Sequence, residues 1–203
     1  MMSPAGIRAA LAAFTARVGA RGDHDGNPGL LPGATALRPA AVLIPLIVRP
    51  AGLSVLLTQR TAHLHDHAGQ ISFPGGRIEA SDRDEVAAAL RETEEEVGLD
   101  RRHVEIVGRL DTYRTRTAYE VTPVVGLVTP PFDLAPDAFE VADIFEVPLA
   151  FVLDPANRAR QSRVFEGTER HFWAVSYESR YIWGATVGML VNLAEVLAAG
   201  GRT

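Results

Sequence analysis

The chain has 203 residues, of which 47% are hydrophobic, and its formal net charge is −5 at pH 7. This length suits one well-buried core, so we expect a single domain over residues 1–203. The sequence lacks the basic tract that duplex nucleic acid requires, and it contains neither cysteine nor lysine. Disulfides, thiolate metal sites, cysteine nucleophiles and lysine Schiff bases are therefore excluded.

We expect neither a membrane span nor a secretory signal. No segment reaches the roughly 18 apolar residues that a membrane helix needs. Residues 1–18 lack the charged-then-apolar order of a secretory signal. The sequence therefore favours a cytoplasmic protein that binds no membrane and, given its charge, no nucleic acid.

The first predicted element is a helix at the N-terminus. Ser3 precedes Pro4, which is typical of a helix start, and apolar residues follow at helical spacing as far as Val18. Residues 19–39 are rich in glycine and proline, which predicts a loop. Residues 1–39 are thus expected to form an N-terminal helix and loop.

Most of the remaining predicted elements are strands. We expect them at residues 40–48, 53–60, 70–73, 104–113, 120–128 and 140–147, with a hairpin formed by 162–165 and 171–177. A helical turn is predicted at 148–153 and a helix at 185–199. Many strands with one long central helix and helices near both ends indicate an α/β fold with a mixed sheet covered on both sides.

The central segment, which contains Arg91-Glu92-Thr93-Glu94-Glu95-Glu96, has the spacing of a helix packed on a core. At about 100° per residue, one stripe contains Val86, Ala89, Leu90, Thr93 and Val97. The acidic residues on the neighbouring face are Glu85, Glu92, Glu95 and Glu96, whereas Glu94 points away. Carboxylates one turn apart repel one another, and a divalent cation would remove that repulsion.

A glycine turn precedes this helix. Pro74-Gly75-Gly76 stands just before it, and glycine tolerates the dihedral angles that turn a backbone carbonyl toward an ion. Mg²⁺ takes its ligands from carboxylates, water and substrate phosphates. A glycine turn followed by a carboxylate helix therefore favours a diphosphate site with a bound cation.

Residues 76–99 resemble the Nudix box, written G-x5-E-x7-R-E-U-x-E-E-x-G-U, in which U is aliphatic. Residues 91–99 match its second half, except that Thr93 stands where an apolar residue is usual. The first half is one residue longer than the standard box, with Asp82 in place of the usual glutamate. This expansion resembles the Nudix subgroup that hydrolyses coenzyme A.

The same subgroup carries an upstream signature, L-L-T-x-R-S-x-x-L-R-x-H-x-G-Q-V-x-F-P-G-G. Residues 56–76 read LLTQRTAHLHDHAGQISFPGG and depart from it at Thr61, His65 and Ile71. The two motifs are contiguous over residues 56–99. The resemblance implies a Nudix-type α/β/α sandwich with a mixed β-sheet, which hydrolyses a diphosphate bond with Mg²⁺ or Mn²⁺.

The resemblance also implies roles for residues in the box. The implied metal ligands are Glu92, Glu95, Glu96 and a carbonyl of Gly75 or Gly76. Arg91 would hold a carboxylate of the box by a bidentate pair, and Asp82 is expected to brace the helix start. The attacking water needs a general base, for which Glu140, by its rough position, and Glu92 are the candidates.

The candidate substrate-binding residues are Arg60, His67 and Gln70. Arg60 ends a predicted strand and meets a phosphate with its guanidinium fork, unless it forms a salt bridge within the fold. His67 and Gln70 match the upstream signature and either contact substrate or organise the loop. Expected at the surface are His63 and His65, and expected in the core, rather than as platforms for adenine, are Trp173 and Trp183.

We therefore expect an enzyme that cleaves coenzyme A or acyl-CoA to 3′,5′-ADP and 4′-phosphopantetheine or its acylated form. Two alternatives remain open: a Nudix hydrolase of NADH, ADP-ribose or a dNTP, and a non-catalytic Nudix-fold sensor that binds a nucleotide. A sensor has no need of mutually repelling carboxylates, which argues against it. Nudix relatives often dimerise, so a homodimer is expected from the resemblance alone.

Overall fold

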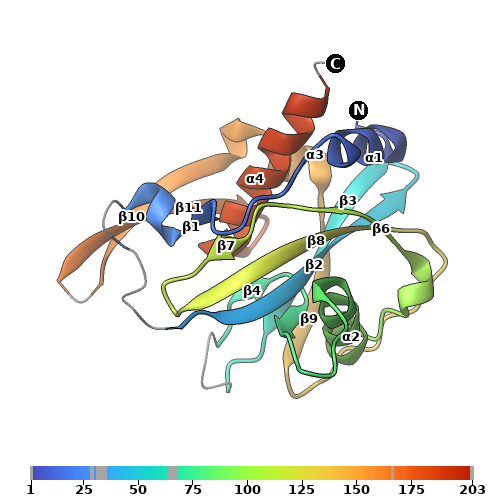
Figure 1. The fold of residues 1–203 in the computed structure, drawn as a ribbon, viewed down its shortest axis with the longest axis horizontal. Coiled ribbons are helices and arrows are strands. Elements are labelled where there is room, and N and C mark those ends of the chain that lie inside the picture. Colours follow the sequence, from blue (N-terminus) through green and yellow to red (C-terminus); the bar gives the residue numbers. More distant parts are fainter. Residues whose placement is uncertain (1, 28–29, 31–35, 64–67, 166, 202–203) are drawn as a thin grey trace.

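The computed structural model describes residues 2–27, 30, 36–63, 68–165 and 167–201. A nine-stranded mixed sheet forms its centre (Figure 1). In this sheet β2 (Arg38–Arg49) runs parallel to β8 (Tyr119–Val128) and antiparallel to β3 (Gly52–Arg60). The other strands of the sheet are β1 (Arg21–Gly22), β4 (Ile71–Ser72), β5 (Gly75–Arg77), β6 (Val104–Arg109), β7 (Tyr113–Arg114) and β9 (Val141–Pro148).

The central strands are covered on both faces, which explains their nearly continuous apolar runs. Along β2, Ile44 and Leu46 point into a core cluster shared with the terminal helices. Leu43, on the opposite face, packs with Ala88 and Ala89 of α2 (Glu85–Val97). The helices on the first face are α1 (Pro4–Ala12), α3 (Leu149–Leu153) and α4 (Ala185–Gly200). This arrangement confirms the predicted α/β/α sandwich with a mixed sheet (Figure 1).

Helix α2 begins and ends at residues suited to those positions. Asp84 accepts a hydrogen bond from the Ala87 N–H at 2.8 Å and so caps the first turn. At the other end, Gly98 has φ of 70°, a left-handed conformation that glycine adopts without strain. The predicted stripe is confirmed: its buried members are Ala89, Thr93 and Val97, its partly buried members are Val86 and Leu90, and Ala88 and Glu96 are also buried.

Three predicted segments are wrong in part, because long-range hydrogen bonds override the local pattern. Helix α1 ends at Ala12, and the chain beyond it is held instead by Asp111, whose carboxylate accepts from the Arg17 N–H at 2.8 Å. The predicted strand at 104–113 breaks after Arg109, and the expected loop at 19–39 contains β1 and η1 (Asp23–Gly26). The other short 3₁₀ turns are η2 (Arg101–His103) and η3 (Pro155–Asn157).

A second, three-stranded antiparallel sheet consists of β10 (Arg158–Phe165), β11 (Thr168–Tyr177) and β12 (Arg180–Trp183). The predicted hairpin is confirmed and is longer than expected. The core placement of Trp173 and Trp183 is wrong, since they are 38% and 37% exposed. Trp173 lies on β11, which with β10 extends past the helices (Figure 1). Trp183 follows the buried Ile182 on β12, so its side chain points to the opposite face of the small sheet.

Within the described ranges, none of the helices combines the length and the apolar character needed to cross a membrane.

Candidate active site

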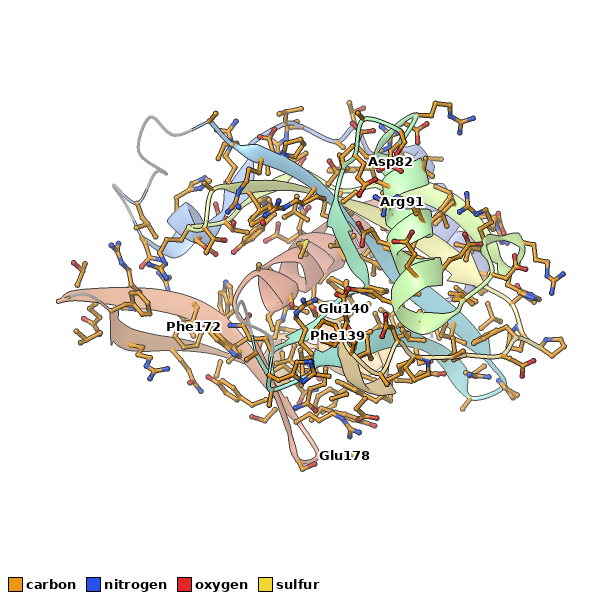
Figure 2. All side chains as sticks on the ribbon, turned by 90° about the horizontal axis from the view of Figure 1, so that it is seen from below. Asp82, Arg91, Phe139, Glu140, Phe172 and Glu178 are labelled. Carbon is orange, nitrogen blue, oxygen red and sulfur yellow. The ribbon has the colours of Figure 1, made fainter. Side chains whose placement is uncertain are left out.

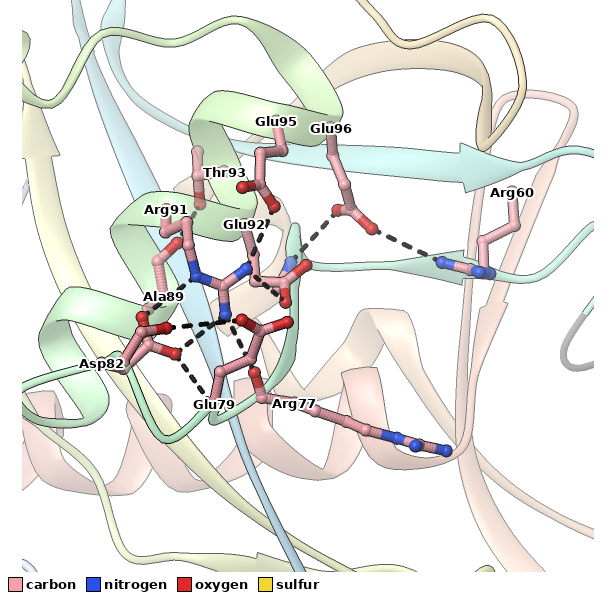
Figure 3. A network of polar contacts seen from close by, with 12 residues as sticks. Arg60, Arg77, Glu79, Asp82, Ala89, Arg91, Glu92, Thr93, Glu95 and Glu96 are labelled. Carbon is pink, nitrogen blue, oxygen red and sulfur yellow. Dashed lines mark hydrogen bonds and ion pairs between the residues drawn. The ribbon is translucent and has the colours of Figure 1, made fainter.

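The carboxylates of α2 lie where this helix faces β5 and the end of β3 (Figure 3). Gly76 of β5 lies directly against Glu92, because a Cβ added to Gly76 would be 2.5 Å from the Glu92 Cδ. Gly75 donates its N–H to Glu96 Oε2 at 3.1 Å. Gly75 and Gly76 lie in β5, paired with β2, and not in the predicted turn. The absence of a Cβ at Gly76 lets the backbone approach Glu92.

Arg91 organises the box through its whole guanidinium group (Figure 3). Its Nε and Nη2 donate to the two carboxylate oxygens of Asp82 at 3.0 and 2.9 Å. Its Nη1 donates to Glu92 at 2.9 Å and to Glu95 at 3.0 Å. The bidentate pair expected for Arg91 is thus present, with Asp82 as its partner.

Asp82 braces the turn before the helix, as expected. It accepts the Glu79 N–H at 2.8 Å, and its own N–H donates to the Glu79 carbonyl at 3.0 Å. The hydrogen bonds from Arg91 and Glu79 lower the pKa of Asp82 to about 2. The helix starts only after Asp84, so Asp82 lies in the turn before it.

Glu96 is a buried acid, only 5% exposed. Burial raises its pKa to about 7, against the opposing effects of the Gly75 N–H and of Arg60, whose Nη1 lies 3.5 Å from Glu96 Oε1. Burial also raises the pKa of Glu92, while Arg91 acts against that shift.

Glu140 joins the same site from a distant part of the sequence. Its Oε2 lies 3.7 Å from Nη2 of Arg60, so Arg60 lies between Glu140 and Glu96. The negative charge of Glu140 contributes to the raised pKa of both Glu92 and Glu96. Arg60 thus forms salt bridges within the fold, which is the alternative left open for it, and its Nε is buried without a hydrogen-bond partner among the described residues.

Other expected residues are placed differently. Glu85 does not join the site carboxylates, because it pairs with Arg109 on β6 at 3.2 Å. Glu94 points away, as predicted, and accepts from the Nε of Arg101 at 2.8 Å. His63 is exposed, as predicted, whereas His65 and His67 lie outside the described residues. Gln70 accepts the Arg60 N–H with its backbone carbonyl at 2.9 Å.

The donor set suits a hard divalent cation, although the described side chains do not form a closed cage. Among the described residues, no three acidic or imidazole side chains converge in the geometry of a metal site. The reason is that Arg91 holds Glu92 and Glu95, while Arg60 and Gly75 hold Glu96. These carboxylates, whose charges raise the pKa of Glu92 and Glu96, still provide the oxygen ligands that such a cation prefers.

Sequence reasoning missed Phe139. This residue precedes Glu140, is 65% exposed, and has its ring centroid 4.9 Å from that of His63. The available signal was an aromatic residue beside the candidate base in a segment rich in proline and aspartate.

Comparison with known proteins identifies the class of enzyme. A model of the NUDIX domain matches residues 37–166. The "Uncharacterized Nudix hydrolase NudL" of Escherichia coli O7:K1 is 42% identical over 157 residues, which cover 77% of this chain and 81% of the relative. The chain therefore belongs to the Nudix family, and it is a pyrophosphohydrolase that acts on a nucleoside diphosphate derivative.

Two solved structures are also similar to this chain. The MutT protein from Methanosarcina mazei Go1 has a TM-score of 0.48 at 16% identity, over 83% of this chain and 96% of that one. A Caenorhabditis elegans (C. elegans) Ap4A hydrolase binary complex has a TM-score of 0.47 at 23% identity, over 55% of this chain and 80% of that one.

Proposed function

We propose that the substrate is coenzyme A or an acyl-CoA, whose diphosphate is hydrolysed to 3′,5′-ADP and 4′-phosphopantetheine or its acylated form. The observation that carries this proposal is the contiguous signature at residues 56–76. The fold supports the proposal, because residues of this segment lie next to the site carboxylates. Arg60 lies beside Glu96 and Glu140, Gly75 contacts Glu96, and Gly76 contacts Glu92.

The residues proposed to hold Mg²⁺ or Mn²⁺ are Glu92, Glu95, Glu96 and a carbonyl of Gly75 or Gly76. When bound, such an ion supplies a Lewis acid that neutralises charge on the phosphate oxygens. Arg91 positions Glu92 through the hydrogen bond at 2.9 Å and is itself fixed by Asp82. The guanidinium group of Arg60, whose Nη atoms face Glu96 and Glu140, donates to a phosphate oxygen of the substrate.

The proposed general base is Glu140, with Glu92 as the alternative. Glu92 already accepts a hydrogen bond from Arg91, whereas Glu140 has a partly exposed side chain whose ion pair with Arg60 is long, at 3.7 Å. A carboxylate oxygen of Glu140 takes a proton from water as that water attacks phosphorus. The bridging P–O bond then breaks, and its oxygen leaves with the second phosphate.

A substrate panel tests the proposal. Steady-state rates are measured with coenzyme A, NADH, ADP-ribose and dNTPs, each with Mg²⁺ and with Mn²⁺. We expect the largest kcat/KM for coenzyme A, and a tenfold preference for any other compound overturns the substrate assignment.

Variants separate the two candidate bases. Glu140→Gln is expected to lower kcat by about 10²- to 10⁴-fold while metal binding persists, whereas Glu92→Gln is expected to weaken metal binding as well. If Glu140→Gln retains the rate and pH profile of the native protein, Glu92 is the base.

The single domain, the homodimer and the cytoplasmic location stay predictions.

A further inference from the structure

Phe139 is an exposed aromatic residue directly beside the proposed base. The residue is 65% exposed, whereas Val141, two residues later at the start of β9, is buried. The ring contact of Phe139 in the described chain is with His63, whose plane is inclined by 57° at a centroid distance of 4.9 Å. Figure 2 shows Phe139 and Glu140 together at the end of the segment that leads into β9.

The backbone of Phe139 is held firmly on both sides. Its N–H donates to Asp137 Oδ1 at 2.8 Å, and its carbonyl accepts from Thr61 Oγ1 at 2.8 Å. Thr61 also donates its N–H to the Glu140 carbonyl at 2.9 Å. These bonds join the Phe139 and Glu140 backbone to the residue after Arg60, so the Phe139 backbone is held next to the side chain proposed to bind a phosphate.

We propose that Phe139 and His63 stack on the adenine ring of the substrate. This inference rests on the proposed function. Two aromatic rings prefer offset or tilted contact, and the exposed face of Phe139 provides such a surface for a flat heterocycle. The pantetheine arm is flexible and has no aromatic face. Stacking is therefore assigned to the base, while Arg60 serves a phosphate.

The test compares ligands that differ only in the base. Inhibition constants of AMP and of ribose 5-phosphate are measured for the native protein, Phe139→Ala and Phe139→Trp, with 4′-phosphopantetheine as a second base-free ligand. Phe165→Ala is the matched control, because Phe165 is also exposed but lies at the end of β10. Thermal unfolding checks that each variant is folded.

We expect Phe139→Ala to weaken AMP binding about 5- to 150-fold, the range for the loss of one stacked base. Ribose 5-phosphate and 4′-phosphopantetheine should be unaffected, and Phe139→Trp should retain AMP binding. His63→Ala should weaken AMP binding by a smaller factor. The proposal is overturned if Phe139→Ala binds AMP as tightly as the native protein does, or if the native protein binds AMP no better than ribose 5-phosphate. It is also overturned if this variant binds all three ligands equally less tightly, or if its affinity falls for 4′-phosphopantetheine alone.

Failure of this inference is distinct from failure of the substrate assignment. The inhibition constants are measured against whichever diphosphate the native protein hydrolyses. If that compound is ADP-ribose rather than coenzyme A, the proposed substrate is wrong, while selective loss of AMP binding in Phe139→Ala still supports the stacking role.

Discussion

Glu96→Gln changes the charge of a buried carboxylate while keeping its shape. The side chain is 5% exposed, and the Gly75 N–H that it accepts at 3.1 Å can also be accepted by the glutamine carbonyl. The groups whose charges act on Glu96 are Arg60, which lowers its pKa, and Glu140 and Glu92, which raise it. Burial has the largest effect and raises the pKa from 4.5 to about 7.

The sign of the pH dependence follows from proton binding. Without metal, the folded protein keeps this proton up to about pH 7, whereas the unfolded chain loses it near 4.5. The free energy of unfolding therefore falls as pH rises between these values. The pKa difference corresponds to at most about 3 kcal/mol above pH 7. We expect Glu96→Gln to raise the free energy of unfolding of the metal-free protein by up to that amount at about pH 8, and to leave it unchanged at about pH 4.

Urea unfolding in the presence of a chelator, repeated over this pH range, measures the effect. Glu94→Gln is the control, because Arg101 lowers the pKa of Glu94 and no stabilisation at high pH is expected there. If the free energy of unfolding changes with pH in the same way for the native protein and Glu96→Gln, the reasoning is refuted. With Mn²⁺ added, the native protein should gain stability by mass action, and Glu96→Gln should gain less and lose turnover. Unchanged turnover of this variant with metal present contradicts the ligand role.

Three further substitutions test the box. Arg91→Lys removes the guanidinium fork that holds Asp82 and should lower kcat about 10²-fold. Arg83 is exposed, so Arg83→Lys should leave kcat unchanged. Equal values of kcat for the two variants would contradict the positioning role of Arg91. Gly76→Ala places a Cβ 2.5 Å from the Glu92 Cδ, so titration calorimetry should show weaker Mn²⁺ binding, and unchanged affinity would exclude Glu92 as a ligand. Thr93→Val loses the hydrogen bond to the Ala89 carbonyl at 2.6 Å but keeps the volume, and should change the free energy of unfolding by less than about 1 kcal/mol in urea.

Local patterns were sufficient for much of the fold. The stripe of α2 and the position of Gly98 follow from a helical period and a left-handed φ, both of which depend on neighbouring residues. Three strands of the large sheet, β2, β3 and β8, were also predicted within two residues, because their apolar runs are buried. The local pattern failed after Ala12, where the chain exchanges hydrogen bonds with residues far away in sequence.

The sequence by itself determined the family resemblance, the central helix and the grouping of Glu92, Glu95 and Glu96 on one of its faces. Only the tertiary structure decided which distant groups meet them. The pairing of β3 with β9 sets Arg60 opposite Val141, and so brings Glu140 and Phe139 to the site, while β6 supplies Arg109 to Glu85. No local period encodes such pairings, because strand register depends on contacts across the whole sheet.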